Sequence, residues 1–133
     1  MNIAEVSQTY EMSADTLRYY ERIGLIPPVN RNKNGVRDYT DEDCRWVEFA
    51  KCMRRAGLQI EALIDYVALY QQGDDTSEAR RDILVEQRRQ LAERLSDMQK
   101  TLERLDFKIE VYDKIKLPGP GERIGCTEET NGK

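Results

Sequence analysis

An apolar stripe with seven-residue spacing runs through the charged segment 74–117. Most positions outside the stripe are Arg, Lys, Glu, Asp or Gln. A helix of about 40 residues cannot bury so narrow a stripe on itself, whereas a second such helix can. We therefore predict a coiled-coil homodimer and not a helix lying on its own domain. The predicted seam consists of Leu84, Leu91, Leu95, Met98, Leu102, Leu105 and Ile109. The spacing does not decide between a parallel and an antiparallel pair.

The residues before this segment carry the start and stop signals of four shorter helices. Asn2, Ser13 and Thr40 are N-cap residues that predict helix starts. The first of these helices continues to Tyr10, the second to about Arg22 and the third to about Arg55. A fourth helix is indicated by the apolar spacing from Ile60 to Ala68. Gly24, Gly57 and Gly73 mark the ends of the last three.

The first two helices are separated by roughly four residues, which is the outline of a helix-turn-helix. Asn34-Gly35 follows them and predicts a type I′ turn that joins a small β-ribbon, or wing. The expected fold is all-α with this small β-ribbon. A winged helix-turn-helix domain covers residues 1–72, a dimerisation helix covers 74–117, and a flexible tail covers 118–133.

The chain is acidic overall, with a formal net charge of −4, but one region is basic. Between Thr16 and Arg37 there are five basic residues and one acidic residue, Glu21. Arginine and tyrosine side chains donate hydrogen bonds to phosphate, and arginine also reads guanine edges. This pattern predicts DNA contact by the second helix and the wing. The alternative is that the tyrosines are core residues and the arginines are solvated, and Tyr20 does share a helix side with Leu17.

The chain contains no histidine, which excludes Ser-His-Asp and Cys-His catalysis and every metal site with a histidine ligand. We expect neither enzymatic activity nor a cofactor. Cys44 and Cys52 are about 12 Å apart along one helix, so they cannot share a metal within one chain. Since no apolar run is long enough for a bilayer and Met1 precedes polar sequence, we expect a cytoplasmic protein with reduced thiols and no membrane contact.

Cys52 has cationic neighbours, because Lys51 is adjacent and Arg55 lies three residues later on the same helix face. Nearby cations favour the thiolate and raise its reactivity, although the helix C-terminus disfavours an anion. Local chemistry alone favours an ordinary half-buried cysteine. Cys44 is surrounded by acidic residues that oppose a thiolate.

The segments Thr16–Pro28, TLRYYERIGLIPP, and Asn34–Thr40, NGVRDYT, resemble the MerR family of bacterial transcription regulators. The resemblance extends over roughly residues 1–115. It implies a winged-helix DNA-binding domain and an antiparallel coiled-coil dimer. It also implies a pseudo-palindromic operator between the −35 and −10 elements, which the regulator bends and untwists so that RNA polymerase engages both. The matching positions are Thr16 and Arg18 for the major groove, Tyr19, Tyr20, Arg37 and Tyr39 for phosphates, and Arg54 and Arg55 for a second wing.

Residues 49–58, FAKCMRRAGL, and 60–67, IEALIDYV, resemble the NmlR/AdhR branch of that family. This resemblance implies that Cys52 is a sensor thiol for carbonyl electrophiles or for nitrosative or oxidative stress. The expected function is therefore a transcription activator that works by promoter distortion and is controlled by this thiol.

Two alternatives stay open. One is a metal-responsive regulator of the same family. The metal-sensing members carry a cysteine at the start of the dimer helix and two more after it, whereas here residues 76–79 contain none and only Cys126 follows the helix. The other alternative is a coiled-coil interaction module without a role on DNA.

Overall fold

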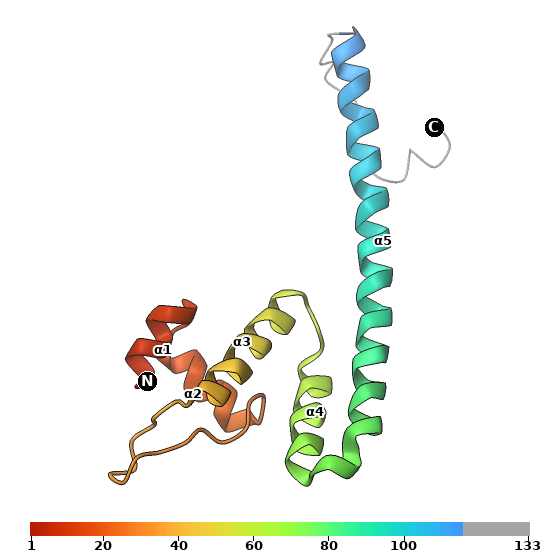
Figure 1. Cartoon of the computed structure of the whole chain (residues 1–133). Coiled ribbons are helices and arrows are strands. Elements are labelled where there is room, and N and C mark those ends of the chain that lie inside the picture. Colours follow the sequence, from red (N-terminus) through yellow and green to blue (C-terminus); the bar gives the residue numbers. More distant parts are fainter. Residues whose placement is uncertain (116–133) are drawn as a thin grey trace. The chain divides into compact units, whose positions relative to one another are not determined.

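The computed structural model describes residues 1–115, so the expected tail and Cys126 lie outside the described residues. The chain divides into two units, residues 1–91 and the residues from 92 onward. The elements in chain order are α1 (Ile3–Tyr10), α2 (Ala14–Ile23), α3 (Asp41–Arg55), α4 (Ile60–Gln72), the 3₁₀ turn η1 (Asp74–Thr76) and α5 (Ser77–Ile115) (Figure 1). The expectation of a mostly helical fold is confirmed, and none of these helices is long and apolar enough to cross a membrane.

The predicted helix caps are present. Asn2 Oδ1 accepts a hydrogen bond from the Glu5 N–H, and the Glu5 carboxylate accepts one from the Asn2 N–H, both at 2.8 Å. Thr40 and Asp43 form the same reciprocal pair at the start of α3, and the Ser13 side chain caps α2. Because these bonds satisfy amide groups that a helix start leaves unpaired, they fix where α1, α2 and α3 begin.

A small apolar core holds the first unit together. It brings together residues from α1, α2, α3 and α4 and from the loops between them. Its buried members are Val6, Leu17, Leu25, Ile26, Val29, Tyr39, Cys44, Val47, Ala50, Leu58 and Leu63.

The start of α5 belongs to this unit as well. Leu91 packs against the core, so this residue of the predicted seam has a partner within its own chain. Gln87 is only 5% exposed, and its Oε1 accepts a hydrogen bond from the Gln59 N–H at 3.3 Å. Gln59 is the N-cap residue of α4 and makes no cap bond with its own side chain. A side chain of α5 therefore caps α4.

The wing differs from the predicted β-ribbon. Pairing is limited to one antiparallel bridge between Arg31 and Arg37 within the described chain. Gly35 has a φ of 82°, but Asn34 does not have the positive φ that a type I′ turn needs. Instead the Asn32 side chain accepts hydrogen bonds from the amides of Asn34 and Val36 at 2.9 and 3.1 Å. These bonds favour a three-residue loop ending in left-handed Gly35. Figure 1 shows this loop in orange, extending away from the helices.

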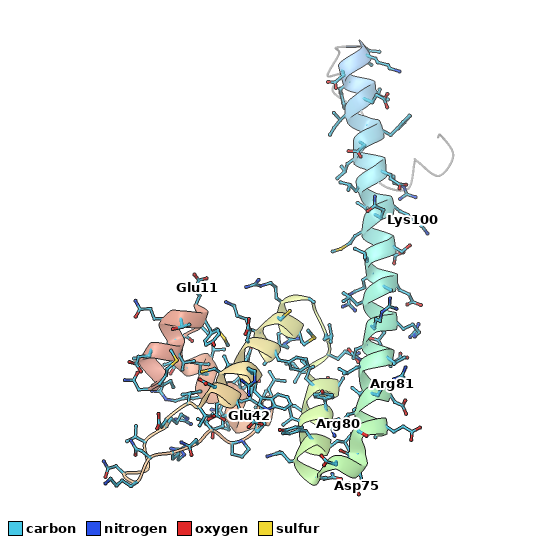
Figure 2. The ribbon with its side chains drawn as sticks, viewed as in Figure 1. Glu11, Glu42, Asp75, Arg80, Arg81 and Lys100 are labelled. Atoms are coloured by element: carbon cyan, nitrogen blue, oxygen red, sulfur yellow. The ribbon has the colours of Figure 1, made fainter. Side chains whose placement is uncertain are left out.

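The described part of the second unit, residues 92–115, is a single continuous stretch of α5 without a buried side chain. Figure 2 shows side chains on all sides of this stretch, with Lys100 labelled among them. The predicted seam residues here are between 51% and 69% exposed, and they are Leu95, Met98, Leu102, Leu105 and Ile109. Five large apolar side chains on one helix face form a surface that a second helix can cover.

We predict that Val47→Ala lowers the free energy of unfolding by about 2 kcal/mol, because it removes two buried methyl groups and leaves a cavity. Val47 is fully buried. Val36→Ala is the matched control, since Val36 is 55% exposed in the wing. Its effect should stay below about 0.5 kcal/mol. Urea unfolding of both variants measures the difference, and equal effects would contradict the assigned core.

Candidate nucleic-acid interface and thiol site

Helix α2 exposes the basic and aromatic residues that follow buried Leu17. The Arg18 side chain is 47% exposed and forms an ion pair at 3.0 Å with Asp15 on the same helix face. Tyr19 is 41% exposed, and the Arg22 guanidinium carbon lies 5.1 Å from its ring centre. Since a helix rotates by about 100° per residue, burial of Leu17 turns Arg18 and Tyr19 away from the core.

Two other predicted contact residues of α2 have structural roles. Thr16 lies in the first turn, where its amide and hydroxyl are both hydrogen-bonded to Ser13 Oγ. Tyr20 is half-buried against the core, as its position beside Leu17 indicated. The Tyr20 carbonyl accepts hydrogen bonds from the amides of Leu25 and Ile26 after the helix ends.

Arg37 connects the wing to α2. Its Nε donates a hydrogen bond at 2.7 Å to Oε1 of Glu21, and the two side chains are 22% and 12% exposed. The guanidinium therefore lies at the base of the wing, held by a carboxylate that is mostly shielded from water.

Tyr39, one of the residues expected to contact phosphate, is buried. The residue is 2% exposed, and its hydroxyl has no hydrogen-bond partner among the described residues. Burial raises the pKa of Tyr39 above its usual value, although the nearby Arg37 guanidinium opposes part of this increase. The ring fills the core where the wing returns to α3, so in this conformation the hydroxyl does not reach a phosphate.

The two arginines expected in a second wing differ in their surroundings. Arg54 is partly buried, and its Nη1 donates a hydrogen bond to the carbonyl of Leu58 in the turn after α3. Arg55 is exposed on the same last turn. Of the two, Arg55 is the one whose side chain is available to a partner, while Arg54 ties the α3–α4 turn together.

Cys52 is exposed on the penultimate turn of α3, and not half-buried. It lies in a hollow of about 340 Å³ between α3 and the end of α1, lined also by Thr9, Tyr10, Glu11, Glu48, Lys51 and Arg55. The Lys51 ammonium donates a hydrogen bond to the Tyr10 carbonyl, so this cation is held at the hollow. Cys44 is buried, with its Sγ 3.9 Å from the Met1 Sδ. The two thiols therefore differ in access to solutes.

An aromatic cluster covers the contact of α3 with α4, and the sequence analysis did not identify it. Trp46 and Phe49 on α3 pack with Tyr66 and Tyr70 on α4, at ring-centre distances from 4.9 to 6.1 Å. The Tyr70 hydroxyl donates a hydrogen bond at 2.7 Å to Glu42, which raises the Tyr70 pKa. Figure 2 labels Glu42 and also Arg80, whose guanidinium carbon lies 5.6 Å from the Tyr70 ring centre. Helical spacing of the aromatic residues within each helix was the available signal.

No group of three or more His, Cys, Asp or Glu side chains within residues 1–115 is arranged to hold a metal ion. The described thiols do not converge either, since one is buried and the other exposed. Within residues 1–115, therefore, Cys52 is the one accessible thiol.

Two family models match the chain. The model described as "MerR HTH family regulatory protein" matches residues 1–69, and the model described as "MerR, DNA binding" matches residues 44–106. The HTH-type transcriptional regulator AdhR of Bacillus subtilis is 58% identical over 93 residues, which are 70% of this chain and 66% of that protein. Regulators named as heavy-metal-dependent also match.

Several solved structures have the same fold, and two of them share the larger part of their length with this chain. A MerR family transcriptional regulator from Listeria monocytogenes has a TM-score of 0.83 and 57% identity, over 85% of this chain and 86% of that one. HiNmlR, described as a MerR family regulator lacking the sensor domain and bound to promoter DNA, has a TM-score of 0.77 and 29% identity. That match covers 86% of this chain and 91% of HiNmlR.

We predict that Tyr39→Phe raises the free energy of unfolding by about 1 kcal/mol, because a buried hydroxyl without a partner is costly. Tyr19→Phe is the matched control at an exposed tyrosine, and it should change stability by less than about 0.5 kcal/mol. Urea unfolding measures both. A clear loss of stability in Tyr39→Phe would show that the hydroxyl is bonded in solution.

Proposed function

Because the chain belongs to the MerR family of helix-turn-helix regulatory proteins, we propose that it activates transcription by distorting promoter DNA under the control of Cys52. It is a DNA-binding transcription regulator and not an enzyme, since that is what the family comprises. Family membership also decides against a coiled-coil module without a role on DNA. The exposed thiol of Cys52 on α3 supports the proposed response to electrophiles.

In the proposed complex, α2 enters the major groove with Thr16 and Arg18. Phosphates are bound by Tyr19, Tyr20 and Arg37, with Arg55 on the second wing. The exposure of Arg18 and Tyr19 supports this assignment. The similar HiNmlR, whose solved structure contains promoter DNA, supports it as well. Tyr39, which is buried, and Arg54, which binds the Leu58 carbonyl, would support this interface from within the domain.

Activation would use the energy of DNA deformation. Bending a promoter site costs on the order of 1–6 kcal/mol, which many small contacts to the backbone can offset. RNA polymerase would then bind the two promoter elements at a spacing and orientation that the relaxed DNA does not present. An adduct would move the population between two such states only if it stabilised one of them relative to the other by a few kcal/mol.

Cys52 is suited to start such a change because of its place on α3. A thiolate sulfur that attacks a carbonyl carbon forms a C–S bond, and the former π pair moves to oxygen, which takes a proton from water. The product is a hemithioacetal, which adds bulk inside the hollow between α3 and the end of α1.

The end of α3 is connected to α5 through hydrogen bonds. Arg54 donates a hydrogen bond to the Leu58 carbonyl. The next residue, Gln59, is the N-cap residue of α4, and its backbone N–H donates a hydrogen bond to the side chain of Gln87 on α5. We propose that an adduct on Cys52 shifts α3 and is transmitted along this path. The buried Cys44, on the same helix, has no comparable access to solutes.

The test is transcription in vitro from a promoter that contains the protein's binding site. Wild-type protein treated with methylglyoxal should activate more strongly than reduced protein, and Cys52→Ala should lose this difference while still binding DNA. Cys44→Ala is the control and should respond like the wild type. An unchanged response in Cys52→Ala would reject the sensor assignment. A response to copper or lead salts, with none to methylglyoxal, would favour the metal-responsive alternative.

We also propose that residues 95–109 of α5 form the seam of an antiparallel homodimer. Leu102→Glu should dissociate the dimer, because it places a carboxylate in an apolar helix contact. Lys100→Glu is the control on the outer side of the helix and should stay dimeric. Sedimentation velocity distinguishes the two states, and a dimeric Leu102→Glu would place the interface elsewhere.

A further inference from the structure

Glu21 is the one acidic residue in the basic region from Thr16 to Arg37, and it lies next to the surface that the proposed function assigns to DNA. A carboxylate there opposes binding to phosphates. We propose that Glu21 is nevertheless required for DNA binding, as a positioning residue that holds Arg37 and the root of the wing against α2. This inference rests on the proposed use of that surface.

Both carboxylate oxygens of Glu21 are engaged, and they hold the two ends of the wing. Oε2 accepts a hydrogen bond from the Val29 N–H at 2.9 Å, where the chain enters the wing. Oε1 accepts one from Arg37 Nε at 2.7 Å, where the chain leaves it. One side chain of α2 therefore fixes the wing at its entry and at its exit.

The interaction is shielded, unlike the other ion pair of α2. The Glu21 side chain is 12% exposed and that of Arg37 is 22% exposed, whereas the Asp15 side chain, paired with Arg18, is 96% exposed. Water and salt screen an exposed pair strongly and a shielded pair much less. The bond from Glu21 to Arg37 therefore persists at salt concentrations at which that from Asp15 to Arg18 has little effect.

The geometry also leaves part of Arg37 available. Glu21 binds the Nε of the guanidinium, and no partner of Nη1 or Nη2 is recorded within residues 1–115. A guanidinium anchored at one edge presents its remaining donors in a fixed direction, which suits the fork-like binding of a phosphate. Without Glu21, the Arg37 guanidinium would keep its charge but would no longer be held in a fixed direction.

The inference predicts an effect opposite in sign to that of simple charge. Glu21→Gln removes a negative charge next to DNA, so charge alone would make binding tighter. The amide can accept only one of the two hydrogen bonds, so loss of position should make binding weaker. We expect about tenfold weaker binding and a salt dependence reduced by about one phosphate contact.

The experiment uses the full chain and a DNA duplex selected with wild-type protein from a random library. Fluorescence anisotropy at several salt concentrations gives the affinity and its salt slope for wild type, Glu21→Gln, Arg37→Ala and the double variant. The double variant should bind no more weakly than Arg37→Ala, because both changes remove the same contact. Asp15→Asn is the matched control on α2 and should bind at least as tightly as wild type. Thermal unfolding by circular dichroism confirms that each variant is folded at the temperature used.

Glu21→Asp serves as a second variant that keeps the charge. The shorter side chain cannot reach both Val29 and Arg37, so its binding should also be weaker than that of wild type. Wild-type affinity in Glu21→Gln or in Glu21→Asp would overturn the inference, and so would additive effects in the double variant. Failure of the wild-type protein to select any duplex would overturn the proposed function and this inference together.

Discussion

The burial of Leu17 is the constraint on which the proposed DNA-binding surface depends. This side chain of α2 is fully buried, with Val47 of α3 in the same core. Once one face of a short helix is fixed in a core, the helix period determines the direction of every other side chain. Arg18 and Tyr19 are exposed for this reason, and Tyr20 is half-buried for the same reason. The candidate interface is thus a consequence of apolar packing beneath it.

Helix α5 uses one apolar pattern for two purposes. Leu91 packs on the core of its own chain, whereas Leu95, one helical turn later, is 64% exposed. The seven-residue apolar pattern continues from Leu91 to Leu95, but packing against the core of the same chain stops between these two residues. The change from an internal partner to an unfilled face occurs where the first compact unit ends, between Leu91 and Ala92. Gln87 and Leu91 therefore pack within the first unit, and the residues from Leu95 onward are left for the proposed partner helix.

The sequence was sufficient to predict the helices, because their caps and glycine stops are local signals. Asn2, Ser13 and Thr40 cap the helices they were expected to cap. The wing turn was predicted less well, since the side chain of Asn32 determines it and Asn34-Gly35 does not act alone.

Burial was predicted least well, because it depends on residues that are distant in sequence. Tyr39 is covered where the wing meets α3, and Cys52 is exposed because the end of α1 leaves a hollow beside it. The aromatic cluster was missed for the same reason, since α3 and α4 supply two rings each.

The path from the end of α3 to α5 runs through Gln59 and Gln87, whose side chains are both uncharged amides. The chain has no histidine, so no side chain with an ordinary pKa near neutrality can alter this path. A fall of a fraction of a pH unit would therefore leave the linkage between α4 and α5 unchanged, so acid alone would not operate the proposed switch through this path.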